Sequence, residues 1–355
     1  MMAKKAKTVK KSKKPAVKKK IVKKKKTVKK KGRKKKKKGG VNYFGLLIIL
    51  AVIAGVIMFA KTKGSEPLKY IKAQKLAEFS QADKGGNLST PRGLGISPDG
   101  HLYVADQNNS RVVKFRLNGE PVSSWGTEGE ENGQFKEPSG VGVDRDNNVY
   151  VADAWNGRIQ KFDSEGKFLK SLGGTAGGFY SPRNVAVNAY GMVFVADTGT
   201  SRIHRFDTEF NRIGKPFGQR GKAFGNFQEV FGLAFDSQRR LYVGDPGNRR
   251  VAVLTSDLQP VAHINVKGWE AAPPMWPMTA VDSRDYLYVV SSGTQEIWVY
   301  NTKDPKFKYV GTIKNDPQGK GLFNNPLGIA ADSAGNIYVS ETSKGSIVKI
   351  RPIFE

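Results

Sequence analysis

The residues of this chain that could do chemistry are mainly acidic and basic side chains, which recur in pairs at a fixed spacing. The pairs are Asp106 with Arg111, Asp153 with Arg158, Asp197 with Arg202, and Asp245 with Arg250. A carboxylate and a guanidinium on either side of a short turn can form a bidentate ion pair. Because a residue that recurs from copy to copy usually serves the repeat, we expect these pairs to be structural rather than catalytic.

Nucleophilic and metal chemistry have weak support. The chain contains no Cys and no Gly-x-Ser-x-Gly element, which removes two common nucleophile signatures. The three histidines, His101, His204 and His263, are far apart in the sequence, and scattered histidines without cysteines do not make a zinc-like site. We therefore predict no catalytic residue, no metal site and no cofactor.

The acidic and basic pairs belong to a motif that recurs six times. Its clearest copy contains PSGVGVD, NVYVAD and NGRIQKF within residues 138–162. Short alternating runs rich in Val, Ile, Tyr and Phe are typical of strands, and the Asp-Gly and Gly-Asn turns between them are typical of hairpins. The copies start near Pro91, Pro138, Pro182, Val230, Trp276 and Pro326.

This repeat predicts the fold. The copies are 44 to 50 residues apart, and four antiparallel strands per copy form a propeller blade. One such sheet cannot bury both faces, whereas six around an axis can. We predict an all-β, six-bladed β-propeller over residues 74–355. The sixth copy ends after its third strand, so we expect residues 75–80 to complete that blade and close the ring.

The motif resembles the NHL-repeat family over roughly residues 74–350. The Pro-x-Gly, Tyr-Val-Ala-Asp and Asn-x-Arg elements are nearly complete in the first three copies, persist in the fourth, and decay in the last two, where Ser291 and Glu341 replace the Asp. The resemblance implies a six-bladed propeller. The resemblance also leaves an enzymatic function as an alternative, because calcium-dependent lactonase-like propellers carry acidic and Asn metal ligands at the central channel. The histidine ligands of the peptide-amidating lyases have no matching set here.

Residues that depart from the repeat predict a binding face. In a four-stranded blade, the second-to-third loop and the inter-blade loop emerge on the same face, and interfaces favour aromatic residues and Arg. Packing between blades is the alternative for these side chains, and it is the one we expect for Phe135, Phe179 and Phe227. The predicted ligand-binding residues are Arg92, Gln107, Trp155, Arg183, Phe231 and Trp276.

The first 40 residues differ from the rest of the chain. They contain 22 Lys, one Arg and no acidic residue, and residues 64–355 carry only +4 of the net charge of +29. We expect this Lys-rich tail to be disordered. It could contact anionic lipid, bind nucleic acid non-specifically, or remain solvated. The balanced charge of the propeller counts against a uniformly basic nucleic-acid-binding domain.

Residues 41–60 form a run of 20 residues without a charge. At about 1.5 Å per residue, such a helix spans about 30 Å, the thickness of a hydrocarbon core. We predict an uncleaved transmembrane helix, with a cleaved signal peptide or a buried core helix as alternatives. Because the lysines precede it, the N-terminus should be cytoplasmic. The propeller, after a linker at 61–73, should be extracytoplasmic, and periplasmic or at the cell surface if the source is bacterial.

These features favour binding over catalysis. We predict a single-pass membrane protein whose propeller acts as a scaffold or sensor for a protein or envelope ligand. One alternative is a lyase-like or lactonase-like enzyme with its site at the central channel. The other is a nucleic-acid-associated protein that uses the Lys tail or the loop-rich face.

Overall fold

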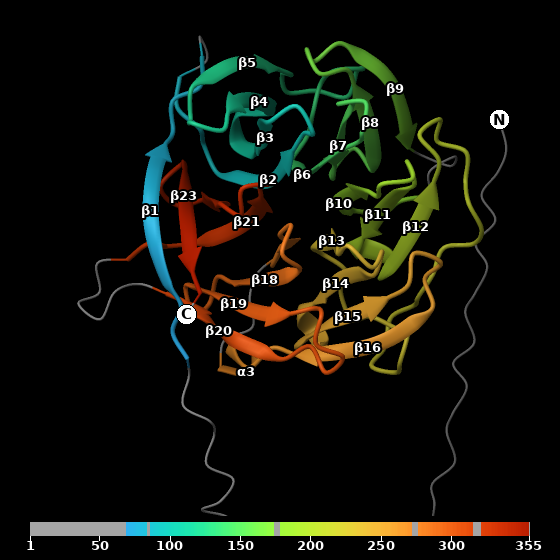
Figure 1. Cartoon of the computed structure of the whole chain (residues 1–355). Helices are drawn as coiled ribbons and strands as arrows, with labels where there is room; N and C mark the ends of the chain where they lie inside the picture. The colour runs from blue at the N-terminus through green and yellow to red at the C-terminus, as the bar shows by residue number, and fades with distance from the viewer. Residues whose placement is uncertain (1–68, 84–85, 174–177, 272–275, 315–320, 355) are drawn as a thin grey trace, which may run out of the picture. The chain divides into compact units, whose positions relative to one another are not determined.

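The strands of this protein form six antiparallel sheets around a central axis (Figure 1). The computed structural model describes residues 69–83, 86–173, 178–271, 276–314 and 321–354, all within the compact unit Pro67–Glu355. Over these ranges the chain is an all-β, six-bladed propeller, as the repeat predicts. The Lys-rich tail and the predicted transmembrane segment lie outside the described residues. Within the described ranges, no helix has the length and hydropathy needed to cross a membrane.

The first three blades follow the chain order, from the innermost strand outward. Blade 1 contains β2 (Pro91–Ile96), β3 (His101–Asp106), β4 (Arg111–Arg116) and β5 (Pro121–Trp125). Blade 2 contains β6 (Pro138–Val143), β7 (Val149–Asp153), β8 (Arg158–Phe162) and β9 (Phe168–Gly173). Blade 3 contains β10 (Pro182–Val187), β11 (Val193–Asp197) and β12 (Arg202–Phe206).

The last three blades continue the ring. Blade 4 contains β13 (Leu233–Phe235), β14 (Leu241–Asp245), β15 (Arg250–Leu254) and β16 (Pro260–Asn265). Blade 5 contains β17 (Thr279–Val281), β18 (Tyr286–Ser291), β19 (Glu296–Asn301) and β20 (Tyr309–Ile313). Blade 6 contains β21 (Pro326–Ala331), β22 (Ile337–Glu341), β23 (Ser346–Ile353) and, from the start of the chain, β1 (Lys72–Phe79). The helical turns are η1 (Gln107–Asn109), η2 (Thr198–Thr200), η3 (Pro246–Asn248) and α3 (Gly268–Ala271).

Blade 3 departs from the four-stranded pattern. The described residues after β12 pair with it only through isolated bridges, between Ile203 and Phe217 and between Phe206 and Arg212. Gly214 and Pro216 interrupt this segment. Proline lacks the N–H donor that a ladder needs, and glycine weakens a strand interior. The repeat therefore predicts a fourth strand where the local sequence can form only bridges.

Strand β1 completes blade 6. It pairs antiparallel with β23, from Lys72 opposite Ile353 to Phe79 opposite Ile347. The strand expected at residues 75–80 thus begins three residues earlier, at Lys72. Just before it, Tyr70 bridges to Thr312 of β20, so the chain crosses from the outer edge of blade 5 to that of blade 6. The sixth blade is thereby built from both ends of the propeller.

The two faces of the ring can be named by their turns. Pro91 lies opposite Asp106, and Pro138 lies opposite Asp153. The innermost strands therefore start on the same face as the turns that follow each second strand. We call this the mouth face, and the other side the opposite face. Because β1 runs antiparallel to β23, the chain enters the propeller on the opposite face and reaches the mouth face at Phe79.

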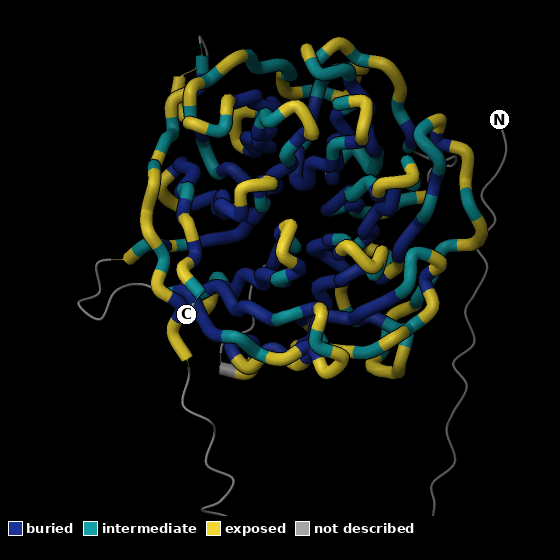
Figure 2. The backbone as a smooth tube through the Cα atoms, in the orientation of Figure 1, coloured by how far each residue is buried: buried dark blue, intermediate teal, exposed yellow. Residues whose placement is uncertain are grey.

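The core lies between the blades, while exposed residues concentrate in turns and on outer strands (Figure 2). Phe135 and Phe227 are fully buried there, and Phe179 is partly buried. Aromatic residues on the second strands also carry a polar contact, because a buried Tyr hydroxyl needs a partner. These hydroxyls donate to turn carboxylates, at 3.1 Å from Tyr150 to Asp144, 2.9 Å from Tyr242 to Asp236, 3.0 Å from Tyr288 to Asp282 and 3.1 Å from Tyr338 to Asp332.

Candidate ligand site at the mouth face

Four of the six predicted ligand-binding residues meet in one small pocket at the mouth face. Arg92, Arg183, Phe231 and Trp276 line it together with Ser139, Met278, Leu327 and Gly328. Arg92 and Arg183 are the second residues of β2 and β10, in blades 1 and 3. Trp276 lies just before β17 of blade 5. These residues are far apart in the sequence but close in space, because every innermost strand starts at the mouth face.

Both arginines contact the same aromatic ring. The Cζ atom of Arg92 lies 3.8 Å from the centroid of the Trp276 ring, and that of Arg183 lies 5.3 Å from it. A guanidinium within about 6 Å of an indole face is attracted by its quadrupole. Trp276 also has a φ of 53°. This left-handed conformation is unfavourable for a bulky residue and is more common at functional sites.

The two guanidinium groups differ in their partners. Arg183 forms an ion pair with Glu137, with 2.8 Å between Nη1 and Oε2. Arg92 is 8% exposed, and its buried Nε has no hydrogen-bond partner. Burial lowers the pKa of Arg92 to about 10. Glu137 opposes that effect and Arg183 adds to it. Arg92 is therefore a buried cation with an aromatic neighbour but no counter-ion among the described residues.

A wider pocket of about 230 Å³ lies beside the small one and shares Arg92, Trp276 and Leu327 with it. Its polar lining contains hydroxyl and amide groups from blades 1 and 6. Sequence analysis missed these residues, because small polar residues are common in the turns of every copy. They are Thr90, Asn325, Thr342 and Ser343.

Gln107 and Trp155 do not join this cluster. Trp155 follows β7 on the mouth face and is 72% exposed, whereas Gln107 is 5% exposed. The Gln107 Nε2 atom has no hydrogen-bond partner. Neither residue lines the two pockets that contain Arg92. The predicted face is thus a compact group of four residues with Trp155 as a separate exposed aromatic.

The central channel offers little for acid–base chemistry. It holds about 260 Å³ and is lined mainly by small and apolar residues of the innermost strands, with Asn184 and Thr279 as polar side chains. Among the described residues that line it, none is Asp, Glu or His. The described part of the chain contains no group of three or more His, Asp or Glu side chains that could hold a metal ion.

Comparison with known proteins agrees with the repeat. The NHL repeat profile matches residues 88–115 and 135–162, which lie in blades 1 and 2. These two segments match the NHL repeat. A search of curated proteins by sequence gives no match.

Solved structures similar to this propeller include several enzymes. A streptogramin B lyase has 11% identity and a TM-score of 0.55, over 80% of this chain and 98% of the lyase. A gluconolactonase from Xanthomonas campestris has 16% identity and a TM-score of 0.58, over 80% and 90%. The aldose sugar dehydrogenase from Streptomyces coelicolor, bound to PQQ, has 13% identity and a TM-score of 0.56, over 81% and 100%. At such identities the likeness shows the fold alone.

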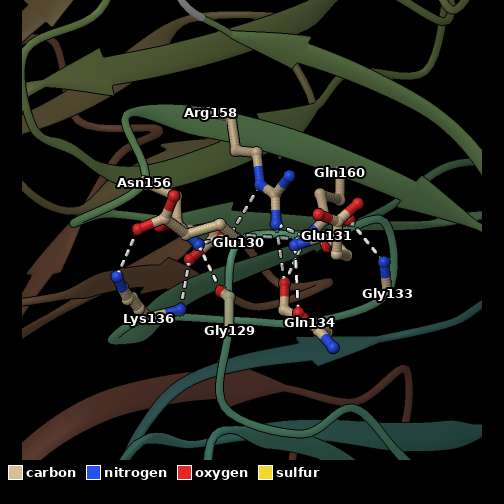
Figure 3. Close-up of polar contacts among 10 residues, drawn as sticks. Gly129, Glu130, Glu131, Gly133, Gln134, Lys136, Asn156, Arg158 and Gln160 are labelled. Carbon is tan, nitrogen blue, oxygen red and sulfur yellow. Dashed lines mark hydrogen bonds and ion pairs between the residues drawn. The ribbon is translucent and has the colours of Figure 1, made fainter.

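The acidic and basic residues of the NHL motif form ion pairs in three blades. The distance from the Arg Nε to the Asp Oδ2 is 2.7 Å for Arg111 with Asp106, 2.7 Å for Arg158 with Asp153, and 3.1 Å for Arg250 with Asp245. In blade 2, Arg158 also donates to the carbonyl oxygens of Glu131 and Gln134 (Figure 3). The pair therefore ties the turn to the inter-blade loop.

The fourth expected pair, between Asp197 and Arg202, does not form. Arg202 is exposed and has no ion pair in the described part of the chain. Asp197 instead accepts a hydrogen bond of 2.5 Å from the Thr200 hydroxyl, and the His204 Nε2 atom lies 3.6 Å away. Burial alone raises the pKa of Asp197, but the nearby His204 ring, the Thr200 hydroxyl and the backbone N–H of Ser181 outweigh that effect and lower the pKa. The prediction fails because the Thr200 hydroxyl and the backbone N–H groups of Tyr180 and Ser181 satisfy the carboxylate.

Proposed function

We propose that this protein is a binding module, a membrane-anchored extracytoplasmic NHL propeller that holds a ligand or protein partner at its mouth face. The observation that carries the proposal is the contact of two guanidinium groups with one strained tryptophan. Arg92, Arg183 and Trp276 come from three different blades and are not part of the repeated ion pairs. Aromatic and Arg side chains at a mouth are typical anchors for a partner.

The channel lining supports binding over catalysis. General acid–base chemistry needs a titratable group within hydrogen-bond reach of the substrate, and the lining residues of the channel include none. The enzyme alternative draws its support from the lyase, lactonase and dehydrogenase folds that the propeller resembles. If the replacement of an Asp, Glu or His residue of this protein abolished turnover of a substrate without unfolding the protein, that result would favour the enzyme alternative.

The anchor and the location are proposed from the sequence. Residues 41–60 carry no charge, and 23 basic residues precede them, a pattern that supports a cytoplasmic N-terminus. The described chain enters the propeller at Lys69–Lys72, on the opposite face.

Protease accessibility tests the proposed location. Tags on Met1 and Glu355 would be followed by immunoblot in intact cells and in permeabilised cells. We expect digestion of the tag on Glu355 alone in intact cells, with the N-terminal fragment kept in the membrane fraction. Protection of the C-terminal tag until the membrane is permeabilised would contradict an extracytoplasmic propeller and favour the nucleic-acid alternative.

Site-specific photo-crosslinking in living cells tests the proposed face. A photoreactive amino acid would replace Trp155 or Ser343 on the mouth face, and Tyr190 on the opposite face. Tyr190 is a matched control because it is an exposed aromatic residue in a turn, like Trp155. We expect adducts from the two mouth positions and none from Tyr190. Adducts of equal yield from Tyr190 would contradict a mouth-face site, and nuclease-sensitive adducts would support nucleic acid as the partner.

A further inference from the structure

We propose that the wider mouth pocket is an oxyanion site, in which Arg92 binds a carboxylate or phosphate group of the ligand. This inference rests on the proposed function and names the chemistry of the group that would be bound there. A carboxylate and a phosphate group would be bound in the same way, because the N–H donors of a guanidinium group can pair with two oxygens of either.

The Arg92 side chain is buried and incompletely hydrogen-bonded. It is 8% exposed, and its Nε has no hydrogen-bond partner. Removing a guanidinium from water without a counter-ion is unfavourable unless a bound group supplies the missing hydrogen bonds. The other buried motif arginines show the contrast, since Arg111 and Arg250 each pair with a carboxylate. Arg92 has the burial of these arginines without their partner.

The charges of the cluster around Trp276 do not balance. Two guanidinium groups face the Trp276 ring, and Glu137 is the acidic residue whose charge acts on Arg92. The Glu137 carboxylate is occupied by Arg183, at 2.8 Å. The described lining of both mouth pockets contains no acidic side chain. One positive charge is therefore left over at the site, and an anion would balance it.

The wider pocket beside Arg92 has a size and a lining that suit an oxyanion. The pocket of about 230 Å³ is large enough for a small organic anion or for the acidic end of a longer ligand. Its walls contain the Thr90 and Ser343 hydroxyl groups and the Asn325 amide, next to Arg92. Hydroxyl and amide donors beside a guanidinium suit an oxyanion, which needs several donors at once. Trp276 supplies an apolar wall for the rest of the ligand.

The competing explanation is that Arg92 is a structural plug that holds blades 1 and 5 together through Trp276. The two explanations predict opposite effects on the stability of the unliganded protein. If Arg92 is a plug, Arg92→Met lowers the melting temperature. If Arg92 awaits an anion, Arg92→Met removes an unpaired buried charge, so the melting temperature stays the same or rises while anion binding is lost.

The test uses the purified full-length chain in detergent, with inorganic phosphate or acetate as the probe and chloride at equal ionic strength as the reference. Thermal unfolding and tryptophan fluorescence are measured for wild type, Arg92→Met, Arg92→Lys and Arg239→Gln. Arg239 is the matched control because its guanidinium also stacks on an aromatic ring, at 4.5 Å from Tyr190, on the opposite face. All four proteins retain the Lys-rich tail, so anion binding to the tail cancels in the comparison.

We expect phosphate, acetate or both to stabilise wild type and Arg239→Gln equally, and the anion that acts identifies the source of the charge. Arg92→Lys keeps the charge but loses the fork, so it should bind about tenfold more weakly. Arg92→Met should lose the response. Equal responses in wild type and Arg92→Met, or no response of wild type to either anion, would overturn the inference. Adducts from Trp155 and Ser343 without an anion response would leave the proposed function standing alone.

Discussion

The guanidinium carbon of Arg92 lies 3.8 Å from the ring centroid of Trp276, across the mouth between blades 1 and 5. This contact joins the residue with an unpaired buried charge to the residue with a left-handed backbone. Two unfavourable features in direct contact suggest a site that was selected for binding rather than for stability. The properties of this contact can be tested apart from any ligand.

Replacement of the shared tryptophan should weaken the mouth. Trp276→Leu removes the ring that both Arg92 and Arg183 contact, and we expect a loss of about 1–3 kcal/mol in the free energy of unfolding, from two cation–π contacts and buried apolar area. Trp155→Leu is the control, because Trp155 is 72% exposed, and it should change stability by less than about 0.5 kcal/mol. Urea unfolding followed by circular dichroism measures both; equal effects would contradict the stacking.

The ion pairs of the repeat should matter in blade 2 but not in blade 3. Arg158→Ala leaves the fully buried Asp153 without its charged partner, and we expect a cost of about 3–5 kcal/mol. Arg202→Ala, at the same repeat position, removes an exposed side chain that forms no ion pair in the described structure. It should change stability by less than about 0.5 kcal/mol. A large effect of Arg202→Ala in chemical denaturation would show that the motif pair forms in blade 3 after all.

Glu341 should make blade 6 sensitive to pH. It is fully buried, its Oε2 atom accepts hydrogen bonds from the backbone of Asn324 and Asn325, and its Oε1 has no partner. Burial raises the pKa of Glu341 above its ordinary value of 4.5. The folded state therefore favours the protonated form of Glu341. The contribution of this form to the free energy of unfolding is fully present below pH 4.5, and it is lost as the pH rises through the pKa of the folded state.

Glu341→Gln removes that titration. The variant should gain stability relative to wild type at neutral pH, and the difference should shrink as the pH falls toward 4.5. Glu78 provides a control of opposite sign. Its pKa is lowered, mainly by the hydrogen bond from Lys75, so Glu78→Gln should lose stability above that pKa. Denaturant midpoints measured across the pH range would contradict the prediction if both variants shifted in the same direction.

The closing strand should be needed for a cooperative, monomeric propeller. Deletion of residues 69–79 removes β1 and exposes the edge of β23 along its whole length. An exposed sheet edge pairs readily with other chains, so we expect self-association and a lower melting temperature. Size-exclusion chromatography and thermal unfolding measure these changes. A synthetic peptide of residues 69–81 should reverse them; a deletion variant that stays monomeric with an unchanged melting temperature would contradict the role of β1.

The features that could be predicted from the sequence alone are those that depend on interactions between residues close together in the chain. Alternating strands, Asp-Gly turns and the motif spacing are local signals, and they determined the six blades and the closing role of the first strand. They also predicted which positions depart from the repeat. They failed in blade 3, where Pro216 interrupts the fourth strand and His204 replaces Arg202 as a neighbour of Asp197. A repeat pattern assigns the same partner in every copy, whereas the actual partner depends on which side chain reaches the carboxylate.

The mouth site was decided by tertiary structure. Arg92 and Trp276 are 184 residues apart in the sequence, and no local pattern says that a guanidinium of blade 1 will reach an indole of blade 5. Their contact exists because ring closure brings the starts of all innermost strands to one axis. The burial that leaves Arg92 without a counter-ion arises in the same way, since it depends on neighbours contributed by several blades. The sequence determined the scaffold through short-range periodicity, and the closed ring decided which side chains meet.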